Sequence, residues 1–196
     1  MPRSFTPIAA KRPQSIGGLL DLQAARDPHH PALSCLETTL SRTELAARVN
    51  RRARALQAAG VAQGDFVAIA LPNGTAFLEI AFACWVVGAT PAPVSHRLPT
   101  FELQAILALL APKVVVGGAA ARETGATVID EAALYDPALS GDPLPGRVSA
   151  HVKAIASGGS TGRPKVIVDH ARATLDPDTP SLGMRAGDNV IIPGPL

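Results

Sequence analysis

Residues 66–94, FVAIALPNGTAFLEIAFACWVVGATPAPV, predict the architecture of the chain. This stretch opens with an apolar run rich in β-formers, which a Pro-Asn-Gly turn signal closes. Ala76 to Val87 then predicts a largely buried helix that ends at Gly88, before a short, proline-containing extended segment at Thr90 to Val94. A strand, a helix and a second strand in this order are typical of parallel strands joined by a crossover helix.

The same alternation continues on both sides of this unit. Further segments with helical or strand patterns are, in chain order, Ile16 to Arg26 (helix), Pro31 to Leu40 (two short strands around a turn), Ser41 to Gly60 (helix), Thr100 to Leu110 (helix), Val114 to Val116 (strand) and Val128 to Asp130 (weaker strand). We therefore predict an α/β fold with a mainly parallel, helix-flanked sheet.

The helix that starts at Ser41 has a clear N-terminal signal. Ser41 and Glu44 are spaced as a capping box, in which a hydroxyl and a carboxylate three residues apart cap the first turn. One face of this helix is apolar and carries Leu45, Val49 and Leu56.

The charge balance does not indicate a nucleic-acid partner. The chain has 18 basic and 16 acidic residues, a net charge of +2. Its arginines at 51, 52 and 54 are close together, but no interleaved aromatic residues accompany them, as a nucleic-acid surface would require. We expect Arg51, Arg52 and Arg54 to form a solvated helix face.

Composition predicts a soluble, cytoplasmic protein. Hydrophobic residues make up 47% of the chain, which is ample for a buried core. Residues 1–15 lack the apolar stretch of a signal peptide, and no apolar run approaches the roughly 20 residues that cross a bilayer. Cys35 and Cys84 lie in no metal motif, and we expect Cys84, in the apolar run Ile80 to Ala89, to be a buried free thiol.

Several conspicuous side chains have an ordinary structural role. His29 and His30 lie between prolines in a predicted surface loop, and adjacency alone does not make a metal site. We expect His96 at the surface, and Phe82 and Trp85 in the core.

One glycine-rich stretch carries the chemistry: Ser157-Gly-Gly-Ser-Thr-Gly-Arg-Pro-Lys165. Strand-like apolar runs flank it at Val152 to Ala156 and Val166 to Val168. Its glycines allow a close backbone approach, and successive N–H groups in such a turn form an anion-binding concavity. Because its hydroxyls add donors and Lys165 adds a positive charge, the loop is suited to holding a polyphosphate.

A linker or a Walker-A loop fits this stretch less well. A flexible Gly/Ser linker would not be flanked so closely by strand-like runs, nor end in a stiff Pro-Lys pair. A Walker-A loop needs Lys-Ser or Lys-Thr directly after its final glycine, where a helix opens. Here Arg163 and Pro164 follow Gly162, and the next residues are β-formers.

The loop resembles the phosphate-loop signature of the adenylate-forming superfamily, which includes AMP-forming acyl-CoA synthetases, nonribosomal-peptide adenylation domains and firefly luciferase. The positions that match its pattern are Gly159, Ser160, Thr161, Gly162, Pro164, Lys165 and His170. Gly158 replaces the usual Ser, which removes a hydroxyl, and Val166 replaces the usual Gly, which restricts the backbone after the lysine.

The resemblance extends over nearly the whole chain. The similar segments, in the family's order, are Leu40 to Leu45, Gly60 to Asp65, Val67 to Asn73, Gly88 to Pro93, Pro112-Lys113, Gly187-Asp188 and Pro193 to Leu196. It implies that residues 16–196 are a partial N-terminal, AMP-binding domain, preceded by a flexible arm at residues 1–15. Leu134 to Arg147 is predicted as a surface connection. The chain stops just after Ile191-Ile192, a run predicted to be a strand, which suggests truncation.

The resemblance implies a parent enzyme that uses ATP, Mg²⁺ and CoA to activate a carboxylic acid. In this family the carboxylate attacks the α-phosphorus of ATP, pyrophosphate leaves, and a thiol then displaces AMP. The residues that the resemblance assigns to the nucleotide are Ser157, Gly158, Gly159, Ser160, Thr161, Gly162 and Lys165.

No catalytic or metal-binding residue is assigned, because the remaining motifs of the family would lie downstream. The chain alone is therefore expected to be inactive. One alternative is a non-catalytic, truncated binding module, with a homodimer as one possible assembly; another is a different ATP- or phosphate-binding enzyme. The acid, and the choice between CoA and a carrier-protein thiol, are left open by these residues.

Overall fold

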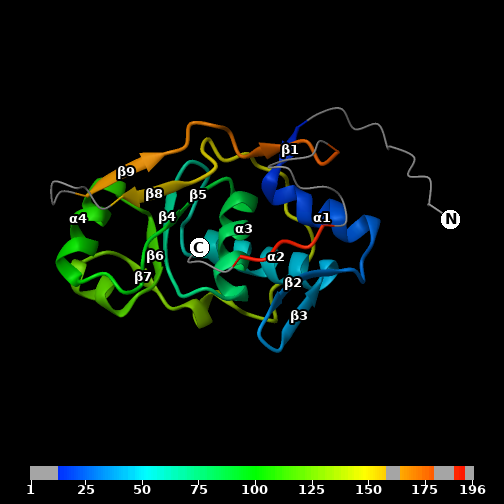
Figure 1. The fold of residues 1–196 in the computed structure, drawn as a ribbon, viewed down its shortest axis with the longest axis horizontal. Coiled ribbons are helices and arrows are strands. Elements are labelled where there is room, and N and C mark those ends of the chain that lie inside the picture. The colour runs from blue at the N-terminus through cyan, green and yellow to red at the C-terminus, as the bar shows by residue number, and fades with distance from the viewer. Residues whose placement is uncertain (1–12, 158–163, 179–187, 193–196) are drawn as a thin grey trace.

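The computed structural model describes residues 13–157, 164–178 and 188–192. Its helices and strands, in chain order, are β1 (Gln14–Ser15), α1 (Ile16–Arg26), β2 (Pro31–Cys35), β3 (Thr38–Ser41), α2 (Arg42–Ala58), β4 (Phe66–Ala70), α3 (Thr75–Val87), β5 (Thr90–Pro93), α4 (Thr100–Leu110), β6 (Val114–Gly117), η1 (Ala119–Thr124), β7 (Val128–Ile129), η2 (Glu131–Leu134), β8 (Ala154–Ser157), β9 (Lys165–Val168) and β10 (Thr174–Leu175). The main sheet is parallel, with the strand order β5-β4-β6-β7 (Figure 1). The predicted α/β fold with a parallel, helix-flanked sheet is confirmed.

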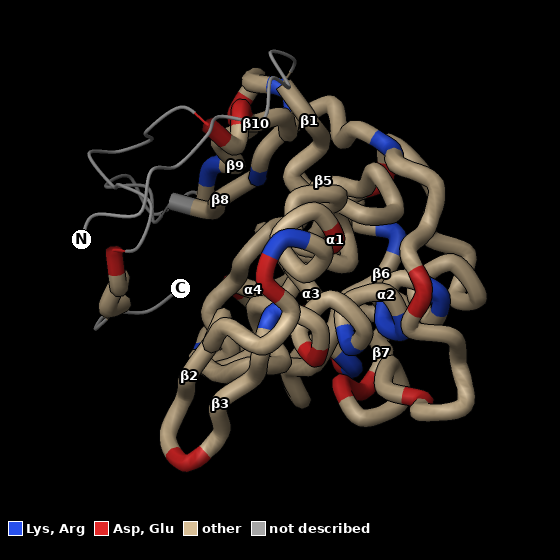
Figure 2. The backbone as a smooth tube through the Cα atoms, turned by 90° about the vertical axis from the view of Figure 1, so that its right-hand side faces the viewer, with Lys and Arg blue, Asp and Glu red and all other residues tan. Residues whose placement is uncertain are grey.

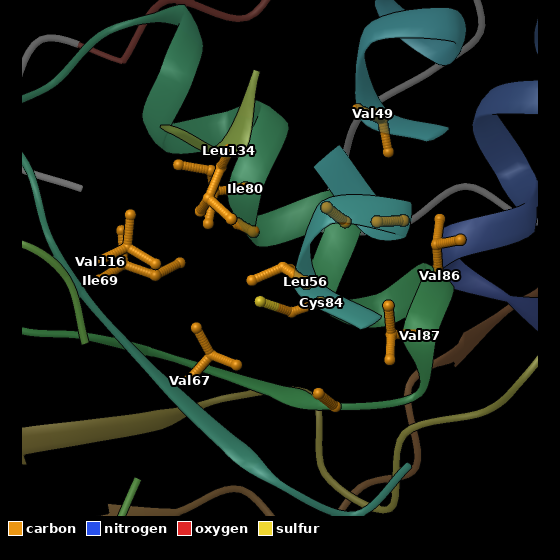
Figure 3. Packing of buried hydrophobic residues seen from close by; sticks show 14 of the residues in the cluster. Val49, Leu56, Val67, Ile69, Ile80, Cys84, Val86, Val87, Val116 and Leu134 are labelled. Atoms are coloured by element: carbon orange, nitrogen blue, oxygen red, sulfur yellow. The ribbon is translucent and has the colours of Figure 1, made fainter. Parts of the chain in front are cut away.

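Both faces of this sheet are buried, because side chains alternate along β4. Val67 and Ile69 belong to a cluster with α2 and α3, whereas Ala68 and Ala70 belong to a second cluster with α4. Figure 3 shows the first cluster, in which Val67 and Ile69 lie across from side chains of the two helices. Cys84 is fully buried there as a free thiol, as predicted, and this burial raises the pKa of the thiol far above its ordinary range.

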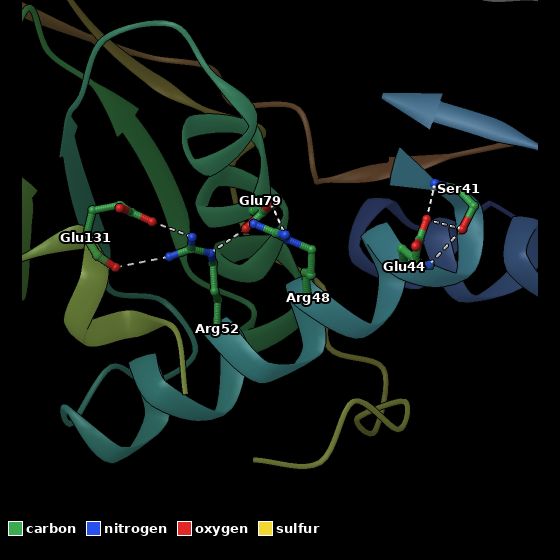
Figure 4. A network of polar contacts seen from close by, with 6 residues as sticks. All are labelled: Ser41, Glu44, Arg48, Arg52, Glu79 and Glu131. Carbon is green, nitrogen blue, oxygen red and sulfur yellow. Dashed lines mark hydrogen bonds and ion pairs between the residues drawn. The ribbon is translucent and has the colours of Figure 1, made fainter. Parts of the chain in front are cut away.

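The predicted capping box of α2 is present. The Ser41 hydroxyl accepts a hydrogen bond from the Glu44 backbone N–H at 3.3 Å, and the Glu44 carboxylate accepts one from the Ser41 backbone N–H at 2.8 Å. The bond from the Ser41 N–H is the main reason why the pKa of the Glu44 carboxyl lies below its ordinary value. Figure 4 shows this pair at the start of the helix.

The prediction of a solvated arginine face on α2 is wrong for Arg52. Only 2% of its side chain is exposed, and it forms ion pairs with Glu79 of α3 and Glu131 of η2 (Figure 4). Arg51 and Arg54 donate instead to backbone carbonyls of Leu139 and Asp142. These two carbonyls lie outside any strand and need hydrogen-bond donors, which the arginines supply. The arginines thereby hold the segment after η2 against α2.

Two further segments differ from their predictions. Leu134, placed in a surface connection, is 1% exposed and packs in the first cluster. Residues 188–192 form no strand, and Val190, Ile191 and Ile192 are 59%, 86% and 51% exposed.

The described end of the predicted N-terminal arm contacts the domain. Gln14 and Ser15 pair with Leu175 and Thr174 in an antiparallel ladder, and the Ser15 hydroxyl caps α1 by accepting from the Gly18 N–H. None of the helices within residues 13–157, 164–178 and 188–192 combines the length and the apolar composition of a membrane span.

The edge strand β5 explains why the main sheet stops there. The N–H groups of Thr90 and Val94 donate to carbonyls on the β4 side, at Asp65 and Ile69. The prolines at 91 and 93 alternate with these donors and have no N–H to offer on the opposite side, which faces β8. Strand β8 therefore lies against β5 without joining its sheet, and pairs with β9 alone among the described strands.

Candidate functional site

The glycine-rich loop connects the two strands of an antiparallel hairpin, β8 and β9. The register pairs Ser157 with Lys165, Ile155 with Ile167, and Ala154 with Val168. Predicted site residues Ser157 and Lys165 therefore lie opposite each other where the loop begins and ends. The others (Gly158, Gly159, Ser160, Thr161 and Gly162) lie outside the described residues.

Lys165 is the one described side chain of the predicted set, and it is exposed at the loop end of β9. In the described part of the chain, no carboxylate forms an ion pair with it. Basic positions along this hairpin are blue in Figure 2. A positive charge that no carboxylate among the described residues pairs with would suit a polyphosphate at the loop.

The hairpin is fixed to the domain by one of its two faces. Ala154, Ala156, Val166 and Val168 pack in or against the second cluster, beside α4. The alternate residues face outward, and Ile155 and Ile167 are 38% and 52% exposed. The seam between the hairpin, β5 and α4 is lined by apolar residues, so it holds the hairpin rather than a charged ligand.

The base of the hairpin is held by polar and ring contacts that the sequence did not indicate. The Trp85 indole N–H donates to the Val152 carbonyl at 2.7 Å, and the hydroxyls of Thr90 and Ser149 are 2.9 Å apart in a fully buried pair. The His151 ring lies parallel to the Phe66 ring, with centroids 6.1 Å apart. Trp85, expected in the core, is in fact half-buried and bonded to the hairpin.

The histidines are placed as follows. His29, His30 and His96 are exposed, as predicted. His170, which matches a family position, is exposed, and its ring lies at 74° to the His151 ring with centroids 5.7 Å apart. No set of three or more His, Cys, Asp or Glu side chains in the described ranges is arranged to hold a metal ion.

Comparisons with known proteins identify relatives of this chain. The family model described as "AMP-binding enzyme" matches residues 20–195. A feruloyl-CoA synthase of Amycolatopsis is 35% identical over 171 residues, covering 83% of this chain and 35% of the relative. The fatty acid–[acyl-carrier-protein] ligase ScoC of Streptomyces coeruleorubidus is 32% identical over 169 residues, covering 79% of this chain and 33% of that relative.

The fold is also found in a solved structure. The inhibitor-bound N-terminal domain of FACL13 from Mycobacterium tuberculosis superposes with a TM-score of 0.70 at 25% identity, covering 82% of this chain and 44% of that one. The chain spans about a third of the length of the two curated relatives, 35% and 33%. The family match over most of its residues establishes that this chain belongs to the AMP-binding enzymes, the adenylate-forming family.

Proposed function

We propose that this chain supplies the polyphosphate-binding part of an ATP-dependent, AMP-forming ligase that joins a carboxylic acid to CoA. The observation that carries the proposal is the β8–β9 register, which sets Lys165 opposite Ser157 across the glycine-rich loop. Because Lys165 is exposed and without a carboxylate partner in the described part of the chain, its charge is available to an anionic ligand.

The difficulty of the proposed reaction is electrostatic, since a carboxylate must approach an anionic nucleotide. The loop, with Ser157, Gly158, Gly159, Ser160, Thr161 and Gly162, would offer backbone N–H groups and hydroxyls to the β- and γ-phosphates. Lys165 would add a charge next to the departing pyrophosphate. Mg²⁺, which this family uses with ATP, would neutralise further phosphate charge.

We propose that other parts of a longer protein supply the acid pocket and the thiol step, and that this chain alone forms no acyl-adenylate. The chain's span of about a third of its relatives supports this division. CoA is the proposed acceptor, because one relative is a feruloyl-CoA synthase. A carrier-protein thiol is the alternative, because another relative is a fatty acid–[acyl-carrier-protein] ligase. We place the enzyme in the cytoplasm.

Calorimetric titration of the chain with ATP·Mg tests the polyphosphate site. Lys165→Ala and Thr161→Ala should each weaken binding about tenfold, since each removes a phosphate contact that Coulomb attraction or hydrogen bonding strengthens. Lys153→Ala is the matched control, because Lys153 is also an exposed lysine but lies at the base of the hairpin. Equal losses in all three variants would overturn the proposed site. Carboxylate-dependent pyrophosphate release by the isolated chain would overturn its proposed inactivity.

The exposed apolar residues favour a second candidate function, a non-catalytic module that self-associates. Val190, Ile191 and Ile192 are more than half exposed in a single segment, and an apolar surface of this kind promotes association. A dimer in light scattering that Ile191→Asp converts to a monomer, together with no response to ATP·Mg, would favour this candidate over the ligase.

A further inference from the structure

We infer that Trp85 is a positioning residue for the glycine-rich loop, because its indole N–H fixes the base of the hairpin that carries the loop. The part of this inference that concerns ATP rests on the proposed function, whereas the anchoring of the hairpin does not.

The contact lies just before β8, where the regular pairing of the two strands ends. Toward the loop, the Asp169 N–H donates to the Lys153 carbonyl at 2.9 Å; one step further back, the Val152 N–H donates to the Ala171 carbonyl at 3.0 Å. Between these two bonds the bonded residue changes from Asp169 to Ala171, two positions, on the β9 side, but from Lys153 to Val152, one position, on the β8 side. The pairing of the two strands is therefore irregular at Val152. The Val152 carbonyl accepts a hydrogen bond from the Trp85 indole N–H at 2.7 Å, so its partner lies on α3.

The donor lies on a helix of the domain core. Trp85 lies in α3 between Cys84 and Val86, which are 0% and 7% exposed. Its ring meets the Phe82 ring edge-on, with centroids 5.2 Å apart at 84°. The hydrogen bond therefore connects the hairpin to a helix that is packed against the parallel sheet.

The hairpin needs such an anchor, because a two-stranded hairpin alone is marginally stable in water. The prolines of β5 have no N–H groups to donate to the hairpin. The apolar inner face of the hairpin packs by the hydrophobic effect, which is not directional and does not fix the orientation of the strands. Other contacts at the base lie further from the loop along the chain: Gln63 donates to the Val148 carbonyl, and Thr90 meets Ser149. Among these polar contacts, Trp85 is the one nearest to the loop.

A small tilt of the hairpin at the hydrogen bond from Trp85 would displace the start of the loop by a larger distance. Ser157 follows Val152 by five residue steps. At a strand rise of ~3.3 Å per residue they span about 17 Å, so a tilt of about 5° at the base moves the loop end by roughly 1.5 Å. Displacements of this size are large compared with the tolerance of hydrogen bonds to a phosphate.

Backbone hydrogen exchange tests the anchoring directly. Trp85 is the single tryptophan of the chain, so growth on β-(3-benzothienyl)alanine replaces only its N–H, by sulfur, and keeps the ring. We expect the amides of Val152 and Asp169 to exchange at least tenfold faster, while that of Ile69 in the central sheet is unchanged. Trp85→Phe is the genetic counterpart, and Phe82→Leu is the control that alters the same ring pair but keeps the Trp85 indole N–H. Unchanged exchange at Val152 and Asp169 would overturn the inference.

Calorimetry with ATP·Mg on the same proteins tests the effect on the loop. The benzothienyl protein should bind ATP·Mg about tenfold more weakly than the unsubstituted chain, with an unchanged melting midpoint of the domain. Faster exchange without weaker binding would overturn the positioning role. If the unsubstituted chain itself binds no ATP·Mg, the proposed function fails, and the exchange measurement still decides whether Trp85 anchors the hairpin.

Discussion

Arg52 and Glu79 form an ion pair from which water is almost completely excluded. The Arg52 Nε lies 2.6 Å from a Glu79 carboxylate oxygen, and the two side chains are 2% and 0% exposed. Arg48 binds the other oxygen of Glu79 at 2.7 Å, and Glu131 pairs with the far side of Arg52. Because each buried charge has a partner, the network fixes α2 against α3, the helix that carries Trp85.

Removing the Glu79 charge should destabilise the domain strongly. Glu79→Gln leaves the Arg52 guanidinium buried next to a neutral group, and breaking one side of a buried pair costs about 3 kcal/mol. Urea unfolding of the variant and the unsubstituted chain measures the difference in free energy of unfolding.

Glu131→Gln is the matched control, because the Glu131 side chain is 34% exposed and water takes over part of its role. We expect that variant to lose less than about 1 kcal/mol. Losses of equal size in the two variants would contradict the view that burial of Glu79 is what makes its charge indispensable.

Replacing Leu36 by glycine should stabilise the chain. The pairing of Cys35 with Thr38 leaves Leu36 and Glu37 as a two-residue turn, and Leu36 has a φ of 51°, a left-handed conformation that disfavours side chains. Its side chain is 97% exposed, so little packing is lost. We expect Leu36→Gly to gain about 0.5–1 kcal/mol in urea unfolding. Glu37→Gly, at a residue with a negative φ, should give no gain, and a gain of similar size there would refute the role of the left-handed backbone.

Gly88 should tolerate alanine less well than Gly64, although both have left-handed backbones. Their φ values are 84° and 94°, but a Cβ on Gly88 would lie 2.9 Å from Gln63 Cγ and 3.0 Å from Arg147 Cβ, whereas one on Gly64 meets nothing within 4 Å. Gly64→Ala is expected to cost about 1 kcal/mol for the backbone alone, and Gly88→Ala about 2 kcal/mol. Thermal unfolding of the pair provides the comparison, and equal midpoints would show that the contact with Gln63 relaxes freely.

The local order of elements could be predicted from the sequence, because prolines and glycines mark where helices stop. Helix α4 has the predicted bounds Thr100–Leu110, followed by Ala111 and Pro112, and α3 ends where Gly88 adopts its left-handed conformation. The capping box at Ser41 was equally visible, since both of its partners lie within one turn.

Contacts between distant residues could not be predicted in this way. Glu79 is 27 residues from Arg52 and lies on an otherwise apolar helix, so nothing near the arginine indicated its burial. At the site, the loop signature is local and was visible, whereas Trp85 is 67 residues from Val152. An indole in an apolar helix resembles any core residue until the strand that it binds is placed beside it.

Asp21 should make the stability of the domain fall as the pH rises. Burial raises the pKa of its carboxyl above the ordinary 3.8, despite a hydrogen bond from Asn50 and the charge of Arg54. The folded state therefore holds this proton to a higher pH than the unfolded state, so the contribution of Asp21 to stability is largest below its ordinary pKa and is lost as the pH passes its folded pKa. Asp21→Asn keeps an acceptor for Asn50 but cannot ionise, so its stability relative to the unsubstituted chain should grow in urea unfolding as the pH rises above about 4. Glu44→Gln provides a control of opposite sign. The lowered pKa of the Glu44 carboxyl stabilises the fold above its ordinary value of 4.5, and this stabilisation is lost as the pH falls. The variant should therefore be less stable than the unsubstituted chain at neutral pH and equally stable in acid. A difference for Asp21→Asn that is constant with pH would mean that the carboxyl ionises equally easily in the folded and unfolded chain.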